Sequence, residues 1–212
     1  MTHEVVHVET GKWRERCYVI AAANRDALII DPGASFDEIV AVLERRPWRP
    51  LAILNTHGHF DHIGAVAPLM ERFQLPFYLH RGDFLLVRQA NLYGRLFEST
   101  GPVKVPAVTH DLKEQPETFD IGPFRIRWLE TPGHTPGSCC FVLGDDLFSG
   151  DTILARGTGR TDLPGANKRQ LAESLGKLAA LNGRLTVRAG HGESLLLSEC
   201  LARVSSKQVT TE

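Results

Sequence analysis

The segment THGHFDH, residues 56–62, places three histidines and an aspartate within six positions: His57, His59, Asp61 and His62. Imidazole nitrogens and carboxylate oxygens are ligands of divalent transition metals in proteins. So many groups of this kind gain little on a surface, and in a core each of them would need its own partner. A bound metal is a common partner for all of them, so the segment predicts a metal site.

The spacing within this segment indicates two metals rather than one. His57 and His59 are two residues apart, so in extended backbone both side chains point to the same side. Asp61 and His62 follow after the chain has begun to turn, and can face a second point. The segment therefore offers two ligands to each of two neighbouring sites.

Three further polar residues stand beside glycine at the predicted ends of strands: His134 in TPGHTPGS, Asp151 in FSGDT and His191 in AGHG. Glycine allows the tight backbone that lets a side chain project from a strand end into a cleft. Three histidines suffice for one ion and two histidines with an aspartate for the other. The remaining aspartate would bridge the pair, with water or hydroxide between the ions.

Two divalent metal ions are therefore expected, with zinc as the first choice and iron or manganese also suited to these ligands. The other histidines lack a glycine-flanked strand end and are assigned no role: His3, His7, His80 and His110.

The elements that must hold these residues alternate between strands and helices. Strands are predicted for HEVVHVE, RCYVIAA and ALIID, with a polar NRD turn between the last two. A helix follows at SFDEIVAVLERR, where Ser35 and Glu38 form a capping-box pattern. LAILN is a short apolar run typical of a buried strand, and the histidine segment leaves its end. Pro68 fits the first turn of a helix that ends near Phe73, and PFYLH is another predicted strand.

Residues 83–98 are predicted to be helical, and the chain from there to about residue 116 to be irregular. In the second half the predicted strands are FRIRWLE, SCCFVLG, DLFSGD and LTVRAGHG, and the predicted helices are KRQLAESLGKLAAL and ESLLLSECLARV. LAILNTHGH and RLTVRAGHG both end a predicted buried strand with His-Gly, which hints at two similar halves. The interleaved elements indicate a layered α/β class.

Length and composition favour one compact domain spanning residues 1–212, with 42% hydrophobic and 23% charged residues. The 24 basic and 25 acidic residues leave a net charge of -1, so no basic excess indicates nucleic acid. The start has no apolar signal region, and no run of about 18 apolar residues indicates a membrane span. The cysteines lack C-x-x-C spacing, and Cys139 adjoins Cys140, which fits a reducing compartment. We therefore expect a soluble cytoplasmic protein without nucleic-acid or membrane partners, and its oligomeric state is left open.

The order T-H-x-H-x-D-H, G-H-T-x-G, G-D and G-H resembles the metallo-β-lactamase superfamily and covers most of the chain. The resemblance implies an αββα sandwich with a dimetal site at the edge between the two sheets. The IIDPG segment matches a further family motif, in which Asp31 supports the site without being a ligand. The ligands that the resemblance implies are His57, His59 and His134 for the first metal, Asp61, His62 and His191 for the second, and Asp151 as the bridge.

Within the superfamily, GDTILARGTGRTDLPG resembles the short bacterial glyoxalase II-like proteins, the hydroxyacylglutathione hydrolase-like group. The β-lactamases usually have a cysteine where Asp151 stands, and the nucleases and diiron flavoproteins carry additional domains. Full-length hydroxyacylglutathione hydrolases have a C-terminal helical domain that binds glutathione, which is not expected here. Their GKFYEG-like segment is replaced by GRTDLPG, in which Arg160 supplies a cation and Asp162 replaces the tyrosine. The thiol carrier is left open, and Arg160 is either a substrate contact or a loop anchor.

Two activities remain. The first hypothesis is hydrolysis of a small hydroxyacyl thioester by a metal-bridging hydroxide, which Asp61 orients while one metal stabilises the oxyanion. The alternative is an iron-dependent persulfide dioxygenase, whose GRTDF-like segment is close to GRTDL here. Its single iron would be held by His57, His134 and Asp151. Those enzymes usually have AHD where this chain has GHG around His191, so the hydrolase is preferred.

Overall fold

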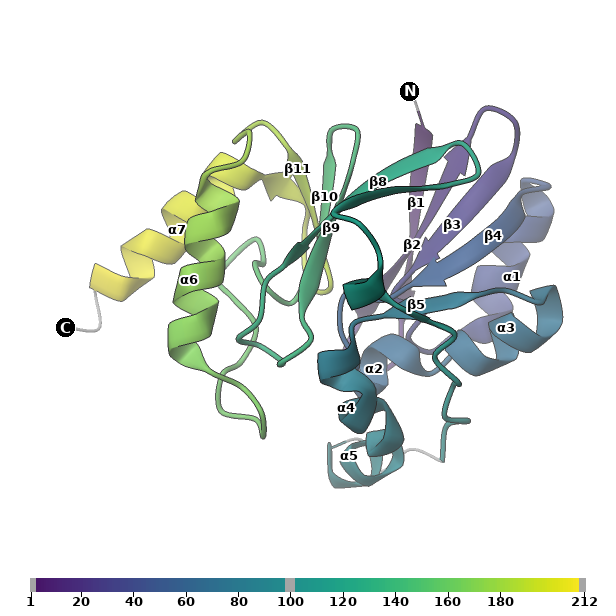
Figure 1. Ribbon diagram of the computed structural model, residues 1–212, viewed down its shortest axis with the longest axis horizontal. Helices are drawn as coiled ribbons and strands as arrows, with labels where there is room; N and C mark the ends of the chain where they lie inside the picture. Colours follow the sequence, from purple (N-terminus) through teal and green to yellow (C-terminus); the bar gives the residue numbers. More distant parts are fainter. Residues whose placement is uncertain (1–2, 98–101, 210–212) are drawn as a thin grey trace.

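In the computed structural model, which describes residues 3–97 and 102–209, two six-stranded sheets lie face to face with helices on their outer faces (Figure 1). The strand orders are β1-β2-β3-β4-β5-β6 and β12-β11-β10-β9-β8-β7. Helices α1 and α3 cover the first sheet, and α6 and α7 cover the second. This arrangement confirms the predicted αββα sandwich.

The first sheet is antiparallel at its start and parallel from β3 onward. Short helices follow β4 and β5 at one end of the sandwich, where the histidine segment lies. The elements of this half are β1 (His3–Thr10), β2 (Glu15–Ala22), β3 (Asp26–Ile30), α1 (Phe36–Arg45), β4 (Arg49–Leu54), α2 (Phe60–Ile63), α3 (Val66–Phe73), β5 (Phe77–Leu79), η1 (Arg81–Asp83), α4 (Phe84–Arg88), α5 (Ala90–Phe97), β6 (His110–Asp111) and η2 (Leu112–Glu114).

The second sheet is antiparallel apart from the parallel pair β10 and β11. Its elements are β7 (Thr118–Ile121), β8 (Phe124–Glu130), β9 (Cys139–Leu143), β10 (Asp146–Gly150), α6 (Lys168–Ala179), β11 (Thr186–Ala189), β12 (Leu195–Leu196) and α7 (Leu197–Val209).

Three apolar layers hold the sandwich together, and β2 explains how a nearly continuous apolar strand arises. Cys17 and Val19 pack with the helices outside the first sheet. Tyr18 and Ile20 point the opposite way, into the layer between the sheets, where they meet Phe148 and other residues of the second sheet. Both faces of the strand are thus buried, so apolar side chains occupy successive positions instead of alternating ones. The third layer lies between the second sheet and its helices.

Each half contains a parallel crossover through a single long helix, β3–α1–β4 in the first sheet and β10–α6–β11 in the second, and the first sheet has two further parallel connections, from β4 to β5 and from β5 to β6. Asp31 directly follows β3 and Asp151 directly follows β10, whereas the two His-Gly segments follow β4 and β11. Carboxyl ends of parallel strands are where α/β proteins place their ligands. The repeated His-Gly pattern in the sequence therefore corresponds to a repeated crossover in the fold.

Most predicted elements are present, but three expectations are wrong in detail. The Ser35 capping box does not form, because Ser35 has a left-handed backbone (φ 55°) and its side chain makes no capping hydrogen bond. The helix predicted for residues 83–98 is two helices that meet at Gln89, and residue 98 lies outside the described residues. The last helix begins only at Leu197, because residues 195–196 pair with β11 as a strand.

The irregular segment is confirmed for residues 102–109, whereas residues 98–101 lie outside the described ranges. Strands β6, β7 and β12 were not predicted from the sequence. Among the residues described, none of the helices has the length and apolar character needed to cross a membrane.

Candidate metal centre

The histidine segment leaves the end of β4 as predicted, on the loop that leads into α2. His57 and His59 lie on the extended part of this loop, and Asp61 and His62 lie one turn later, within α2. The change from strand-like to helical backbone separates the two pairs. His57 and His62 are almost completely buried, with 1% and 0% of their surface exposed.

One group of histidines joins the two halves of the chain. His57, His59 and His134 each offer a nitrogen, and these three atoms lie within 4.8 Å of one another. The Nε2 of His134 is 2.9 Å from the Nδ1 of His59. The Nδ1 of His134 lies 2.8 Å from the backbone carbonyl of Arg160, to which it donates. A proton held at Nδ1 leaves the lone pair of Nε2 directed into the group.

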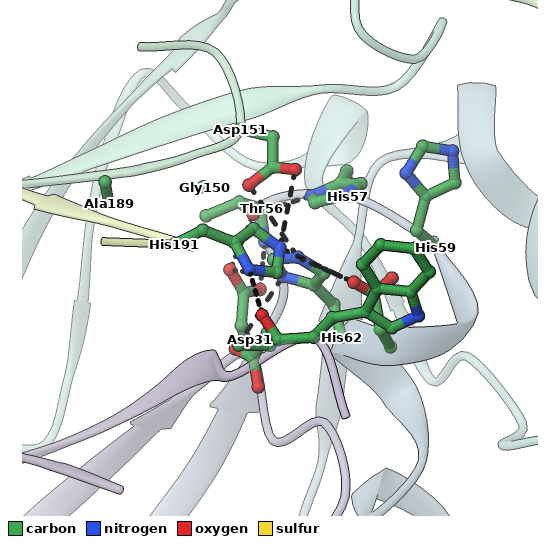
Figure 2. A network of polar contacts seen from close by, with 12 residues as sticks. Asp31, Thr56, His57, His59, His62, Gly150, Asp151, Ala189 and His191 are labelled. Atoms are coloured by element: carbon green, nitrogen blue, oxygen red, sulfur yellow. Dashed lines mark hydrogen bonds and ion pairs between the residues drawn. The ribbon is translucent and has the colours of Figure 1, made fainter. Parts of the chain in front are cut away.

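The second group consists of Asp61, His62 and His191, whose ligand atoms also lie within 4.8 Å of one another. The carboxylate of Asp151 points toward His62 and His191 (Figure 2) and also lies near His134 of the first group. Its Oδ2 is 3.5 Å from Nε2 of His134 and 3.7 Å from Nε2 of His191, and its Oδ1 is 3.8 Å from Nε2 of His62. The structure therefore brings all seven predicted residues to one place, with Asp151 facing both groups.

Several ligand atoms of these groups have no hydrogen-bond partner within the described part of the chain. They are Nε2 of His57, Nε2 of His62 and Oδ1 of Asp151, all buried. Leaving a buried polar atom unpaired costs about 1–3 kcal/mol, so proteins rarely tolerate several side by side. Buried nitrogen and oxygen atoms without hydrogen-bond partners that converge at two points fit divalent metal ions.

Burial lowers the pKa of His57 well below its ordinary value, and the imidazoles of His62 and His59 lower it further. Burial and His134 lower the pKa of His59 to about 3. Both rings are thus neutral at pH 7 and keep the lone pair that metal binding requires.

His62 differs because carboxylates surround it. Burial acts to lower the pKa of His62, but Asp61 and Asp31 outweigh it, so the pKa is raised well above its ordinary value. Burial likewise acts to raise the pKa of Asp61, yet His62 and His191 outweigh it and the pKa is lowered. The second group is therefore held by opposite charges, whereas His57 and His59 in the first group are neutral rings.

Asp31 lies beneath the ligands and supports the loop that carries them. Its carboxylate accepts hydrogen bonds from the backbone N–H and the hydroxyl of Thr56, both at 2.7 Å. Its Oδ2 is also 3.3 Å from Nδ1 of His62. Asp31 further belongs to a third set of converging groups, with His57 and His62.

Glycine is required where β10 and β11 end. A Cβ on Gly190 would lie 2.5 Å from Oδ1 of Asp151 and 2.7 Å from Cε1 of His62, closer than real carbons approach. Gly150 has a positive φ of 49°, and a Cβ there would lie 2.1 Å from the Thr56 hydroxyl. The glycines beside the predicted ligands thus serve close approach as well as tight turns.

Asp83 was not predicted from the sequence, yet it joins the two loops that carry the first group. Its buried carboxylate accepts from the backbone N–H groups of Gly58 (2.8 Å) and Gly137 (2.7 Å) and from the hydroxyl of Thr135 (2.7 Å). Burial raises the pKa of Asp83 despite these bonds. No spacing rule identifies such a residue, because its partners are 25 and more positions away.

Glu15 is a second buried acid that sequence reasoning missed. It is fully buried on β2, accepts from the Thr10 hydroxyl at 2.6 Å, and lies 3.8 Å from Nδ1 of His62. Burial raises the pKa of Glu15 well above its ordinary value. Its only sequence signal is a charge at the start of an apolar strand.

The N-terminal hairpin contacts the last ligand. Nδ1 of His191 lies 3.0 Å from the carbonyl oxygen of Trp13, to which it donates. Next to it, the Arg16 N–H donates to the Gly190 carbonyl at 2.8 Å, and the Tyr18 hydroxyl donates to the Ala189 carbonyl at 2.7 Å. The turn between β1 and β2 therefore fixes the end of β11.

A cavity of about 240 Å³ opens over the two groups. Its floor is formed by predicted ligands and its walls are largely apolar. Arg160 lies on its wall, with its guanidinium 2.9 and 2.8 Å from the two carboxylate oxygens of Asp162. The floor residues are His59, Asp61, His134, Asp151 and His191, and the wall residues are Trp13, Phe60, Leu86, Tyr93, Phe97, Leu154, Thr158, Gly159, Arg160, Leu163 and Pro164.

Comparison with known proteins places this arrangement in context. The family model of the metallo-beta-lactamase superfamily matches residues 10–191. A probable metallo-hydrolase of Bacillus subtilis (strain 168), YqgX, is 39% identical over 84% of this chain and 85% of its own length.

Solved structures agree closely with the fold. The BLEG-1 B3 metallo-β-lactamase has a TM-score of 0.87 at 32% identity, covering 92% of this chain and 95% of its own. TTHA1623, solved in a di-iron-bound form, has a TM-score of 0.82 at 36% identity, covering 92% and 96%. ETHE1 from Myxococcus xanthus has a TM-score of 0.76 at 25% identity, covering 96% and 85%.

Proposed function

This chain belongs to the metallo-β-lactamase superfamily of metal-dependent hydrolases, and from that premise we propose that it hydrolyses thioesters of small hydroxyacyl groups, as the glyoxalase II-like members do. The observation that carries the proposal is Asp151, which faces both ligand groups on the floor of a cavity. Two adjacent sites with one shared carboxylate suit the attack of water on a carbonyl.

In the proposed site, His57, His59 and His134 would hold one divalent ion. Asp61, His62 and His191 would hold a second, and Asp151 would serve both. When bound, such ions lower the pKa of water and polarise the carbonyl that is attacked. Zinc is the first choice, and iron is supported by the di-iron form of the similar TTHA1623.

The chain's own residues orient the reaction. The lowered pKa of Asp61 keeps its carboxylate ionised, so Oδ2 accepts a hydrogen bond from the attacking water and directs its oxygen at the carbonyl carbon. A C–O bond forms as the water releases a proton to solvent, and the C–S bond breaks with its electron pair passing to sulfur. The departing thiolate is a stable leaving group that takes its proton from solvent. Arg160, on the cavity wall, is the proposed contact for the carrier.

The proposed partner is a small-molecule thioester, with neither nucleic acid nor a membrane involved. The proposed compartment is the cytoplasm, whose reducing conditions suit four buried free cysteines.

The test combines metal content with thiol release. We expect about two ions per chain by elemental analysis of protein purified without added metal. The same protein should release thiol from lactoylglutathione and from related thioesters. A chromogenic β-lactam is run beside them, because the similar BLEG-1 is a B3 metallo-β-lactamase. Hydrolysis of the β-lactam without hydrolysis of any thioester would overturn the proposal.

A persulfide dioxygenase is the second candidate, supported by the similarity to ETHE1 and by the approach of His134 to Asp151. Its single iron would use His57, His134 and Asp151. The convergence of Asp61, His62 and His191 on a second point favours the hydrolase. One iron per chain, with oxygen consumption on glutathione persulfide, would identify the dioxygenase instead.

A further inference from the structure

We propose that the acyl group of the substrate carries an apolar tail several carbons long, which lies in the cavity above the metal centre. This inference rests on the thioester hydrolase proposed above and specifies its substrate class. Three features support it: the chemistry of the cavity walls, an aromatic face on one side, and the pairing of the lone cation.

Two separate segments build apolar walls on either side of the ligands. One wall comes from α2, α4 and α5, and the other from the loop that follows β10. Because the ligands form the floor, a carbonyl attacked there must extend its remaining atoms along these walls. The apolar residues of the two walls are Phe60, Leu86, Tyr93 and Phe97 on the first and Leu154, Leu163 and Pro164 on the second, and Trp13 of the turn between β1 and β2 also lines the cavity.

The first wall has a regular aromatic face. The rings of Phe60 and Phe97 are 6.5 Å apart and 7° from parallel, and those of Phe97 and Tyr93 are 6.4 Å apart and 6° from parallel. Three nearly parallel rings offer an extended apolar surface without a hydrogen-bond donor except the tyrosine hydroxyl. Such a surface suits methylene groups better than the charged ends of a peptide.

Charge on the walls argues against a polyanionic occupant. Arg160 is the single arginine or lysine among the described lining residues, and Asp162 pairs with it through both carboxylate oxygens. The hydrogen bonds from Arg160 lower the pKa of Asp162 to about 2, so the aspartate stays ionised at neutral pH. Two carboxylates such as those of glutathione would therefore have to share one arginine on the described walls, which Asp162 already pairs.

The first experiment varies the acyl chain on one uncharged thiol. Acetyl, butanoyl, hexanoyl and octanoyl thioesters of N-acetylcysteamine are compared with lactoylglutathione, using the metal-loaded protein and a thiol-reactive dye. Burial of each added methylene should raise kcat/KM about fourfold until the cavity is filled. We therefore expect hexanoyl to exceed acetyl by about two orders of magnitude.

A pair of leucine variants tests where the tail lies. Leu163→Ser should lower the ratio of hexanoyl to acetyl kcat/KM about tenfold, because it replaces part of the apolar wall. The control is Leu196→Ser, since Leu196 lies on β12, outside the cavity wall, with 41% of its surface exposed. The control should leave both values and their ratio unchanged.

The outcomes separate the two proposals. If no thioester of any length is hydrolysed, the proposed function fails. If thioesters are hydrolysed but kcat/KM is independent of chain length, or is highest for lactoylglutathione, the thioester hydrolase stands and the apolar tail is wrong. If Leu163→Ser leaves the ratio of hexanoyl to acetyl kcat/KM unchanged, the acyl tail does not lie against the wall that contains Leu163.

Discussion

The crossovers β3–α1–β4 and β10–α6–β11 follow similar paths but deliver ligands in different ways. The first half places His57, His59, Asp61 and His62 on one loop and one short helix. The second half delivers single residues from three loops that are far apart in sequence, at positions 134, 151 and 191. One half concentrates its ligands and the other disperses them.

The two sets also differ in exposure and support. His57 and His62 are buried over a foundation of Asp31 and Thr56, whereas the side chain of His191 is 24% exposed and held by a backbone carbonyl of the opposite half. The concentrated ligands are thus supported from within their own half, whereas His191 depends on a contact with the opposite half.

The largest expected effect comes from Asp151, where the two halves meet. Asp151→Ala removes the carboxylate that faces His134, His62 and His191, so metal content should fall and turnover should drop by at least about a hundredfold. Elemental analysis and thioester hydrolysis measure the two effects. The control is Asp145→Ala, because Asp145 is exposed and lies beyond the opposite end of β10. Full activity in Asp151→Ala would show that the halves do not share this ligand.

Asp83 is next, because it ties a loop of each half to the same carboxylate. Asp83→Ala leaves two backbone N–H groups and one hydroxyl without their acceptor, which should cost about 3 kcal/mol of unfolding free energy. Metal affinity should fall about tenfold to a hundredfold, as for other residues that position ligands. Asp83→Asn retains one acceptor oxygen and should recover part of both losses. A stability loss with unchanged metal affinity would limit Asp83 to a structural role.

Asp146, at the start of β10, gives a pH-dependent test of the difference between the two halves. Burial acts to raise its pKa, but hydrogen bonds from His3 and Arg188 outweigh it, so the folded pKa is lowered. A lowered folded pKa contributes stability above the ordinary aspartate pKa of 3.8, and this contribution is lost as pH falls through the folded value. Asp146→Asn should therefore cost about 2 kcal/mol at pH 7, and the difference from wild type should shrink in acid.

Asp26 occupies the corresponding start of β3, where it pairs with Arg49. The side chain of Arg49 is 73% exposed, against 28% for Arg188, so Asp26→Asn should cost less at pH 7, about 1 kcal/mol. Urea unfolding of both variants beside wild type gives the comparison. Equal losses of unfolding free energy in Asp26→Asn and Asp146→Asn would show that exposure of the paired arginine does not distinguish the two halves.

The smallest effect concerns the N-caps of the two crossover helices. The side chain of Asn167 accepts from the N–H of Gln170 at the start of α6, so Asn167→Ala should cost about 1 kcal/mol. Ser35 makes no such bond at the start of α1, so Ser35→Ala should cost only a few tenths. Ser35→Gly should be neutral or stabilising, because the backbone there is left-handed. Thermal unfolding measures all three, and equal losses at the two alanine variants would contradict the cap assignments.

The same contrast explains what could be predicted from the sequence. The concentrated ligands are encoded by short spacing, so His57 and His62 could be recognised without a fold. The dispersed ligands needed a second signal, a glycine beside each strand end. Glu15 and Asp83 had no local signal, because their partners belong to distant segments.

The failed capping box has a comparable cause. The neighbouring Ala34 N–H donates to the hydroxyl of Thr10 at 3.0 Å, and this contact with β1 helps set the path of the chain before α1. A pattern that reads only the next three residues does not include a contact 24 positions away. Local rules therefore worked for element type and failed where a tertiary contact sets the backbone.

The contact between His191 and the Trp13 carbonyl also affects when the site can form during synthesis of the chain. It spans 178 residues, and the neighbouring bond from Tyr18 to Ala189 spans 171. Closing loops of this length is entropically costly and slow, and during synthesis the C-terminal partner emerges last. The first group needs the chain only as far as Arg160, whose carbonyl orients His134, whereas the second group cannot be complete before residue 191 has emerged. The second group of candidate ligands is therefore the last part of the site to become complete.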